Sequence, residues 1–448
     1  MAVFFRFKSF SFLALFFLSG LPLFSLDLAI KNIPDDSGLR ARIKDAWMKE
    51  VPAKVLEKSP VLYNLASGGR LELRAEALVN EFNVILAHEL LDVSGRGTGQ
   101  FPFWAQGSWI ITRDRNRGDV KQIKIFLRSD QFTYILFRPI DSERIYMDVI
   151  LYNAYIRSSV TLPISMDRLY SMRLNELINV AGSHIPIKYF ETDPQLFKNE
   201  RALVSQIREG LPLLKFVDDG AIDENGNYVY IKTGLSQKGS PGLNCSGFTK
   251  WVIDQILFPV TGKYLTIEPL KAAYGQRGSS FTEPWEELRE PFFGLDWIRN
   301  LASTAHSVLR SPAFANLDEI EVRAQPFSYL LGTGSSQSII SYPGFLEYAG
   351  YDIAGLLPLL YTIAIDEPGR FYLAAVNNER GPATTRENPR GRPRMRRFFH
   401  VAVLIPYFTE NGVFQIAVFE SAAETSFNSF RNRYPAHHVN LVRVPVPW

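Results

Sequence analysis

Hydrophobic and polar residues alternate with different periods along the chain. Between residues 36 and 57, apolar side chains recur at every fourth position, as they do on one face of a helix: Leu39, Ile43, Trp47 and Val51. A second helix is expected over 71–92, ended by the glycine-rich run at 94–99. From Phe101 to about Pro163 the period falls to two, which predicts an antiparallel sheet of five or six strands.

The second half of the chain mixes helical and strand patterns. Residues 165–215 predict helices, and a short strand is expected around Tyr228–Lys232. A helix starting near Ser246 carries an apolar stripe that faces a core: Phe248, Trp251, Val252 and Ile256. The apolar stretch from Ile353 to Ile365 is too short to cross a bilayer and is expected to form a buried helix. Three further strands are predicted near the end of the chain: Phe371–Val376, Phe398–Ile405 and Val413–Phe419.

The first 25 residues have the layout of a secretory signal peptide. Arg6 and Lys8 give a short positive region, an apolar run follows, and Ser25 is a small residue suited to cleavage. This layout predicts export to the periplasm or the cell envelope. The alternative interpretation is an uncleaved membrane anchor, for which the apolar run is barely long enough.

Length and charge limit the organisation and the partners. A chain of 448 residues suggests two domains. We expect a helical and β-rich accessory domain over 26–195 and a catalytic domain over 196–448, which carries a long insertion at 258–365. The predicted fold class is α+β. The net charge of +3 is small for this length, so no nucleic-acid partner is expected.

A single cysteine, Cys245, lies at the predicted start of the helix that follows it. An exported protein with one cysteine cannot form an intramolecular disulfide, so the thiol is an inert core residue, an intermolecular link or a nucleophile. Unpaired N–H groups at a helix start favour the thiolate and can bind an oxyanion. Gly247 is expected to keep the approach to the thiol open. Together these features favour the nucleophile.

His400 is the predicted base for this thiol, because it alone of the six histidines starts a strand. The next strand ends at Glu420, and adjacent antiparallel strands can place His400 and Glu420 side by side. Glu420 would then accept a hydrogen bond from one ring nitrogen and direct the other toward Cys245. Gln415 and Ser421 are the alternatives to Glu420. Such thiolate chemistry requires no metal and no organic cofactor.

The sequence around these residues resembles a known family. Asn-Cys245-Ser-Gly-Phe, followed by Trp-Val, is similar to the Asp-Cys-Ser-Gly-Phe-Val nucleophile motif of the NlpC/P60 papain-like cysteine peptidases. His400-Val-Ala-Val-Leu-Ile, a turn and a strand ending in Glu420 resemble that family's histidine hairpin. The resemblance covers the cysteine segment and about 370–422. It implies a papain-like catalytic domain and cleavage of amide bonds in bacterial cell-wall (peptidoglycan) peptides.

Three features differ from the usual family pattern. Asn244 replaces the usual Asp, the Cys-to-His separation is much longer than in compact members, and the third residue is Glu420. Glu at that position occurs in the YiiX-like branch, which implies as an alternative an amidase or acyltransferase acting on lipids or lipoproteins. A further alternative is an inactive binding module of the cell envelope, although the intact Cys245 and His400 argue against it.

Several residues are candidates for substrate contacts. Asn244 and Ser246 flank the thiol, and Tyr228 and Tyr230 lie on the strand before it. Residues 380–397 contain seven arginines and one glutamate, which is typical of a solvated loop or of a clamp for an anionic substrate. Both wall peptides and lipid head groups are anionic, so the run fits either substrate. No metal site is predicted, because neither the 223–234 turn nor the His88 segment carries a complete set of ligands.

Overall fold

The structure is a computed structural model that describes most of the chain. The residues described are 27–66, 68–275, 291–310, 316–331, 338–341, 344–378, 397–435 and 437–447. The signal-like segment 1–25 and nearly all of the arginine-rich run therefore lie outside the described residues. None of the helices in the part that the structure describes is long and apolar enough to cross a membrane.

The N-terminal half is built on an antiparallel meander. Its helices and strands are α1 (Ser37–Lys44), α2 (Pro52–Leu56), β1 (Val61–Asn64), β2 (Arg70–Ala77), β3 (Glu81–His88), β4 (Trp109–Asp114), β5 (Val120–Ile125), β6 (Tyr134–Pro139), β7 (Ile145–Leu151), β8 (Ala154–Leu162), α3 (Met166–Ser171) and α4 (Leu174–Ala181). Strands β1 to β8 pair in sequence order, and β11 (Ser328–Leu331) and β12 (Ser338–Ser341) extend the same sheet beyond β8. The predicted helical region at 36–57 and the five strands between 101 and 163 are confirmed.

The helix expected over 71–92 is wrong, since this segment forms β2 and β3. Leu71 and Leu73 are buried and alternate with charged residues, and Phe82 and Val84 continue the same period of two on β3. Leu, Glu, Arg and Ala favour helices in isolation, but pairing with the neighbouring strands overrides that propensity. His88 consequently ends a strand and does not lie in a helix.

The C-terminal half contains a second antiparallel sheet with helices around it. Its helices are α5 (Lys198–Gly210), α6 (Cys245–Thr261), α7 (Phe293–Leu309), α8 (Leu317–Ile320), α9 (Leu356–Asp366) and α10 (Phe427–Arg433). Its strands are β13 (Phe345–Leu346), β14 (Gly350–Asp352), β15 (Arg370–Asn377), β16 (Phe398–Phe408), β17 (Phe414–Glu420), β18 (Ala423–Thr425) and β19 (His438–Pro445), and a separate hairpin is formed by β9 (Gly220–Ile222) and β10 (Tyr228–Tyr230). The expected cysteine helix, the buried helix near 353–365 and the three strands are confirmed.

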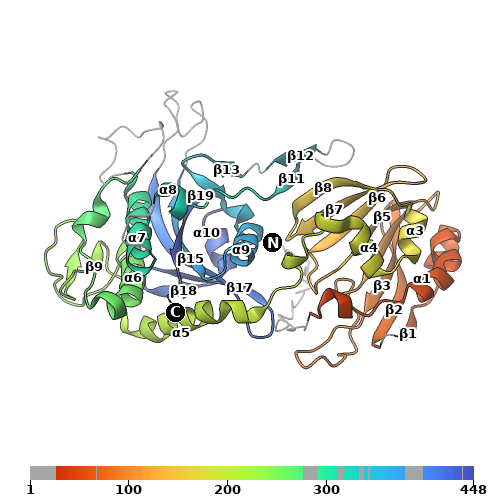
Figure 1. The fold of residues 1–448 in the computed structure, drawn as a ribbon, viewed down its shortest axis with the longest axis horizontal. Coiled ribbons are helices and arrows are strands. Elements are labelled where there is room, and N and C mark those ends of the chain that lie inside the picture. The colour runs from red at the N-terminus through yellow and green to blue at the C-terminus, as the bar shows by residue number, and fades with distance from the viewer. Residues whose placement is uncertain are drawn as a thin grey trace, which may run out of the picture.

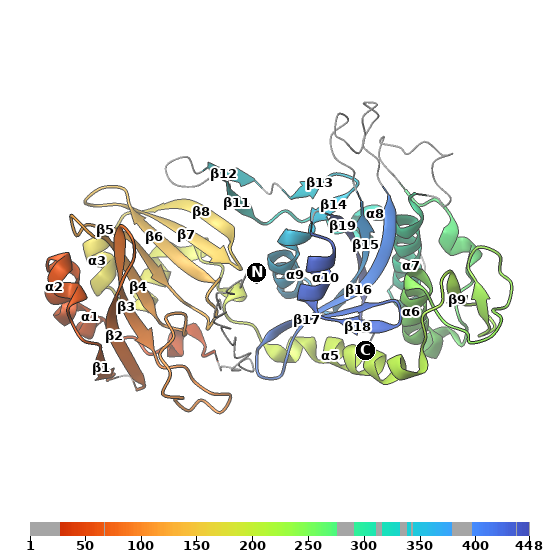
Figure 2. The same ribbon diagram turned by 180° about the vertical axis from the view of Figure 1, so that it is seen from behind.

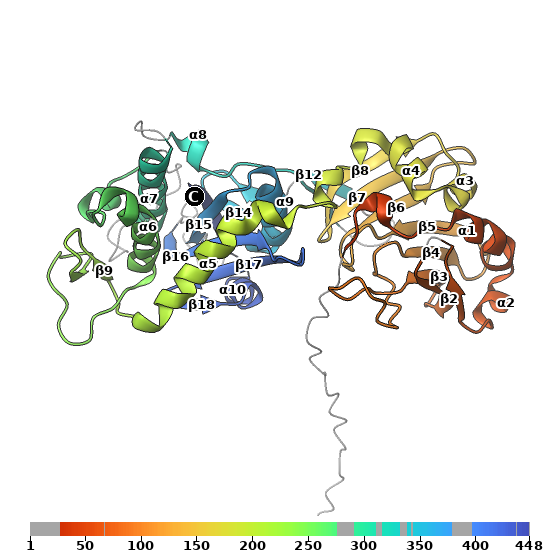
Figure 3. The ribbon, with the colours of Figure 1, turned by 60° about the horizontal axis from the view of Figure 1, so that its bottom comes forward.

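The order of the second sheet is β13-β14-β19-β15-β16-β17-β18. The C-terminal strand β19, which the sequence pattern did not indicate, lies between β14 and β15. Helices α6 and α7 cover one face of this sheet and α9 lies on the other, as both views show (Figures 1 and 2). Helix α5 runs past β16 and β17 (Figure 3) and packs against β16. The fold is therefore α+β, with two large antiparallel sheets.

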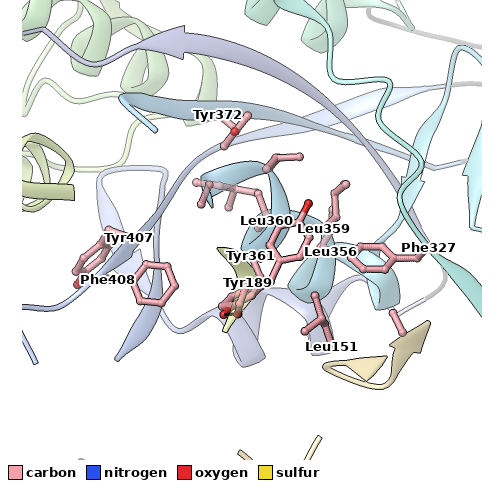
Figure 4. Close-up of a cluster of buried hydrophobic side chains, with 14 of the residues drawn as sticks. Leu151, Tyr189, Phe327, Leu356, Leu359, Leu360, Tyr361, Tyr372, Tyr407 and Phe408 are labelled. Carbon is pink, nitrogen blue, oxygen red and sulfur yellow. Dashed lines mark hydrogen bonds between the residues drawn. The ribbon is translucent and has the colours of Figure 1, made fainter. Parts of the chain in front are cut away.

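A shared core joins the two halves. Leu356, Leu359, Leu360 and Tyr361 of α9 gather with Leu151 of β7 and Phe408 of β16 in one buried cluster (Figure 4). The hydroxyl of Tyr361 accepts a hydrogen bond from Arg128 Nη1 at 2.8 Å and donates to the carbonyl of Tyr189. These contacts satisfy the buried Tyr361 hydroxyl.

The segment 258–365, expected as an insertion, contributes central parts of the C-terminal half. It contains α7, which packs against α6, β15, β16 and β19, and it contains α9 at the junction described above. Trp297 and Leu301 of α7 are fully buried. The segment thus contributes to the same layers that hold the Cys245 helix against the His400 strand.

Candidate active site

Cys245 is the first residue of α6, as the sequence predicted. Asn244 is the N-cap, and its side-chain oxygen accepts a hydrogen bond from the Gly247 N–H at 2.8 Å. The cap leaves other N–H groups of the first turn available near the thiol, where their partial positive charge favours an anion. Trp297 of α7 donates from Nε1 to the Ser246 carbonyl at 2.9 Å, which ties this first turn to the core.

Gly247 is required for packing, and its expected role in keeping the approach open is wrong. A Cβ on Gly247 would lie 2.0 Å from the Gly220 carbonyl oxygen of β9, a distance that atoms of folded proteins do not adopt. The absence of a side chain therefore lets the start of α6 approach the backbone of β9 closely. The Cys245 helix is held in place by this contact.

Substitution of Gly247 by alanine is expected to destabilise the protein by about 1–3 kcal/mol, because backbone must shift to relieve the overlap with Gly220. The free energy of unfolding in urea measures the effect. Gly38→Ala is the matched control: Gly38 also lies in a first helical turn, and its Cβ would meet nothing closer than an Asp36 carboxylate oxygen at 3.3 Å. Equal stability of the two variants would contradict the packing role.

His400 is the third residue of β16 and faces the same pocket as Cys245. Its Nε2 lies 2.6 Å from Glu420 Oε2. The register pairs Val403 with Phe419, so Glu420 falls opposite Ala402 and reaches His400 along a diagonal on the same face. The two side chains are thus adjacent as predicted, although they are not directly opposite each other.

The thiol and the imidazole line the same pocket, and each shifts the pKa of the other. Burial acts to raise the pKa of Cys245, but hydrogen bonding and charge interaction with His400 outweigh it and hold the pKa below its ordinary value. Burial acts to lower the pKa of His400, whereas its interactions with Cys245 and Glu420 raise that pKa to about 9. Because Nε2 is engaged by Glu420, Nδ1 is the nitrogen left to face the sulfur. Each group thus favours the charged form of the other, a thiolate beside an imidazolium.

Glu420 is almost fully buried and accepts hydrogen bonds on both oxygens. Oε2 faces His400, and Oε1 accepts from Arg433 Nη1 at 2.6 Å. Burial acts to raise the pKa of Glu420, yet its interactions with His400 and Arg433 keep that pKa below the ordinary value. The ring of Tyr434 packs against the His400 ring with centroids 5.6 Å apart. Neither Arg433 nor Tyr434 was indicated by the sequence, because no motif marks them.

A pocket of about 310 Å³ opens beside the thiol. Its lining includes Cys245 and His400, apolar side chains from α7, β16 and the turn after β10, and four charged side chains from outside α7 and β16: Ile231, Phe293, Phe398, Phe399, Val401, Asp219, Lys232, Lys271 and Arg397. Lys232, Lys271 and Arg397 thus face the pocket together with Asp219, and Lys271 is also paired with Glu268. This balance favours a substrate with negative charge and some apolar surface.

The predicted substrate-contacting residues divide into two groups. Asn244 and Ser246 line the pocket, and the Ser246 hydroxyl lies 4.0 Å from the Cys245 sulfur. Tyr228 and Tyr230 do not belong to the lining; Ile231 and Lys232, which directly follow them, do. Gln415, an alternative to Glu420, instead accepts a hydrogen bond from the Tyr407 hydroxyl. Across the described ranges, no group of three or more His, Cys, Asp or Glu side chains is placed to hold a metal ion.

Comparison with known proteins gives one match. A family model described as a domain of unknown function (DUF8515) matches residues 30–189. This segment holds α1 to α4 and β1 to β8 and ends before α5, so Cys245, His400 and Glu420 lie outside it. No curated protein and no solved structure matches the chain.

Proposed function

We propose that the C-terminal half of this chain is a cysteine hydrolase that cleaves amide bonds with Cys245, His400 and Glu420 as its triad. The observation that carries the proposal is that Cys245 and His400 line one pocket, while His400 Nε2 lies 2.6 Å from the buried Glu420 carboxylate behind it. A thiolate needs an adjacent base, and the base needs a group that orients it. We assign the nucleophile to α6, the base to β16 and the orienting carboxylate to β17.

The proposed reaction has two halves. The Cys245 thiolate attacks the substrate carbonyl carbon, and N–H groups at the start of α6 stabilise the oxyanion. The C–N bond then breaks as the His400 imidazolium gives its proton to the leaving amine, which leaves a thioester on Cys245. Neutral His400 next takes a proton from water as the water oxygen attacks the thioester carbon. The C–S bond then breaks, the carboxylic acid product leaves, and the Cys245 thiolate and the His400 imidazolium are restored. Glu420 keeps the ring oriented throughout.

A papain-like, NlpC/P60-type catalytic domain is part of the proposal. It is supported by the order of elements, in which a cysteine at the start of a helix precedes an antiparallel sheet whose adjacent strands carry the histidine and the third residue. Amide bonds of cell-wall peptides are the proposed substrates, since Lys232, Lys271 and Arg397 suit their carboxylates. The signal-like segment 1–25 supports export to the periplasm or cell envelope.

A specific observation favours a second candidate substrate. Phe293, Phe398 and Phe399 line the pocket next to the cations, and Phe399 is 39% exposed. Aromatic side chains beside cations also suit an acyl chain with an anionic head group. The alternative function is therefore that of an amidase or acyltransferase on lipid or lipoprotein substrates, with the same triad.

The test is to trap the acyl-enzyme. Purified protein is mixed with cell-wall peptides or with N-acylated lipopeptides, quenched with acid, and the Cys245 peptide is analysed by mass spectrometry. We expect an acyl adduct with the wall peptides, and a hydrolysis rate that falls as the pH rises above about 9, because His400 then lacks the proton for the leaving amine. Adducts with lipopeptides alone would select the second candidate. No adduct, with slow alkylation of the thiol, would indicate an inactive binding module.

A further inference from the structure

Arg433 is the last residue of α10 and reaches the carboxylate of the triad from the side opposite the histidine. Its Nη1 donates to Glu420 Oε1 at 2.6 Å, while Glu420 Oε2 faces His400 Nε2 at the same distance. The Glu420 side chain is 5% exposed, whereas that of Arg433 is 47% exposed. The guanidinium therefore lies between the buried carboxylate and the solvent.

The remaining contacts of Arg433 fix its position. It interacts with the hydroxyl of Tyr434, and its guanidinium lies 5.7 Å from the centroid of that ring. Tyr434 in turn packs against the His400 ring. The nearest acid on β18, Glu424, is already paired with Arg208 and does not compete for Arg433. Arg433 thus contacts two residues that both touch the catalytic histidine.

We propose that Arg433 is a positioning residue for the Cys245–His400 pair, which fixes the second oxygen of Glu420 and offsets part of its negative charge at the imidazole. This inference rests on the proposed function, because it assigns Arg433 a role in the same triad. A planar guanidinium has several N–H donors and can hold a carboxylate in one orientation. With Oε1 held, the carboxylate cannot rotate away from His400 Nε2.

The positive charge of Arg433 acts on the pKa of Cys245 and on that of His400 in the same direction. Glu420 and His400 are faced by Cys245 from α6 and by Arg433 and Tyr434 from α10 and the residue after it, and the pocket that His400 lines also carries four other charged groups: Asp219, Lys232, Lys271 and Arg397. A positive charge nearby favours the deprotonated form of each acid. Removing it makes both the thiolate and the neutral imidazole less stable, so both groups should hold their protons to higher pH.

The experiment measures the rate of Cys245 alkylation by iodoacetamide as a function of pH, which needs no substrate. In the wild type we expect two inflections, one where the thiolate–imidazolium pair forms and one where His400 loses its proton. Arg433→Met is expected to move both inflections to higher pH by roughly half a unit. In a separate assay of cell-wall peptide cleavage, the same variant is expected to lower kcat about tenfold. Arg433→Lys keeps the positive charge but lacks the planar guanidinium with its several N–H donors. The inflections should therefore return toward the wild-type values, while kcat recovers only in part.

Arg431→Met is the matched control, because Arg431 lies on the same helix and packs over Phe427 without contact to Glu420. It should leave both inflections and kcat unchanged. Inflections of Arg433→Met at the wild-type pH, in a protein with an unchanged melting temperature, would overturn the inference. A lower melting temperature without a shift of either inflection would assign Arg433 a purely structural role and would also overturn it. A wild-type profile without the two inflections would instead refute the triad itself.

Discussion

Alanine at either Cys245 or His400 is expected to lower kcat/KM by at least roughly 10⁴-fold, because the nucleophile and its base act as one unit. Cys245→Ala removes the atom that forms the thioester. His400→Ala removes both the partner that lowers the pKa of the thiol and the acid that protonates the leaving amine. Initial rates of amide cleavage, with folding checked by circular dichroism, measure the loss.

The double variant sharpens this prediction. Cys245→Ala combined with His400→Ala should be no slower than either single variant, since effects within a catalytic unit are not additive. His184→Ala is the matched control, because His184 is exposed and lies in the N-terminal half of the chain.

Cys245 is the only cysteine, so the rate of thiol alkylation also tests the pairing in His400→Ala: the thiol of this variant should react slowly at pH 7. Wild-type reactivity in His400→Ala would contradict the pairing.

Glu420→Gln is expected to lower kcat by about 10²–10⁴-fold, the range in which the third member of such triads acts. The physical reason is that Glu420 accepts from two donors, His400 Nε2 and Arg433 Nη1. An amide has one oxygen and one NH₂ group, so one of the two donors must lose its acceptor. Loss of the negative charge also lowers the pKa of His400 from about 9 toward its ordinary value.

The pH dependence of kcat distinguishes a lost interaction between Glu420 and His400 from a general destabilisation of the fold. The alkaline limb of kcat for Glu420→Gln should move to lower pH, because the imidazolium loses its proton more readily without the carboxylate. This shift is opposite in sign to the one expected for Arg433→Met. Glu424→Gln is the matched control, since Glu424 is an acid on the neighbouring strand that pairs with Arg208 and does not touch His400. An unshifted alkaline limb in Glu420→Gln would refute the proposed orientation.

Local patterns predicted the helix and the two strands of the C-terminal half that carry Cys245, His400 and Glu420. The start of α6 follows from Asn244 as a cap and the apolar stripe behind Cys245, and the strands β15 to β17 follow from runs of β-branched and aromatic residues. The same reasoning failed at 71–92, where residues that favour helices form strands because they pair with neighbouring strands of the sheet. Propensity is a weak determinant when strand pairing and burial favour the alternative.

The residues that assemble the site beyond the triad could not be found from local patterns. Arg433 ends a short helix with no motif and Tyr434 follows it, and they reach Glu420 and His400 only because α10 packs against β17. Tyr228 and Tyr230 have the right chemistry for a substrate contact, yet Ile231 and Lys232 line the pocket instead. Which side of a short strand faces a cavity depends on what packs against it.

The sequence by itself determined the kinds of chemistry available: a thiol at a helix start, a histidine near the start of a strand and a carboxylate at the end of the next strand. These are local properties, set by capping, periodicity and turns. Only the tertiary structure decided that α7 and β19 enter the C-terminal layers, that the halves share a core around α9, and that Arg433 covers Glu420. Such contacts join residues far apart in the chain, so their free energy depends on the packing of the whole fold. They therefore produce no periodic pattern in the sequence.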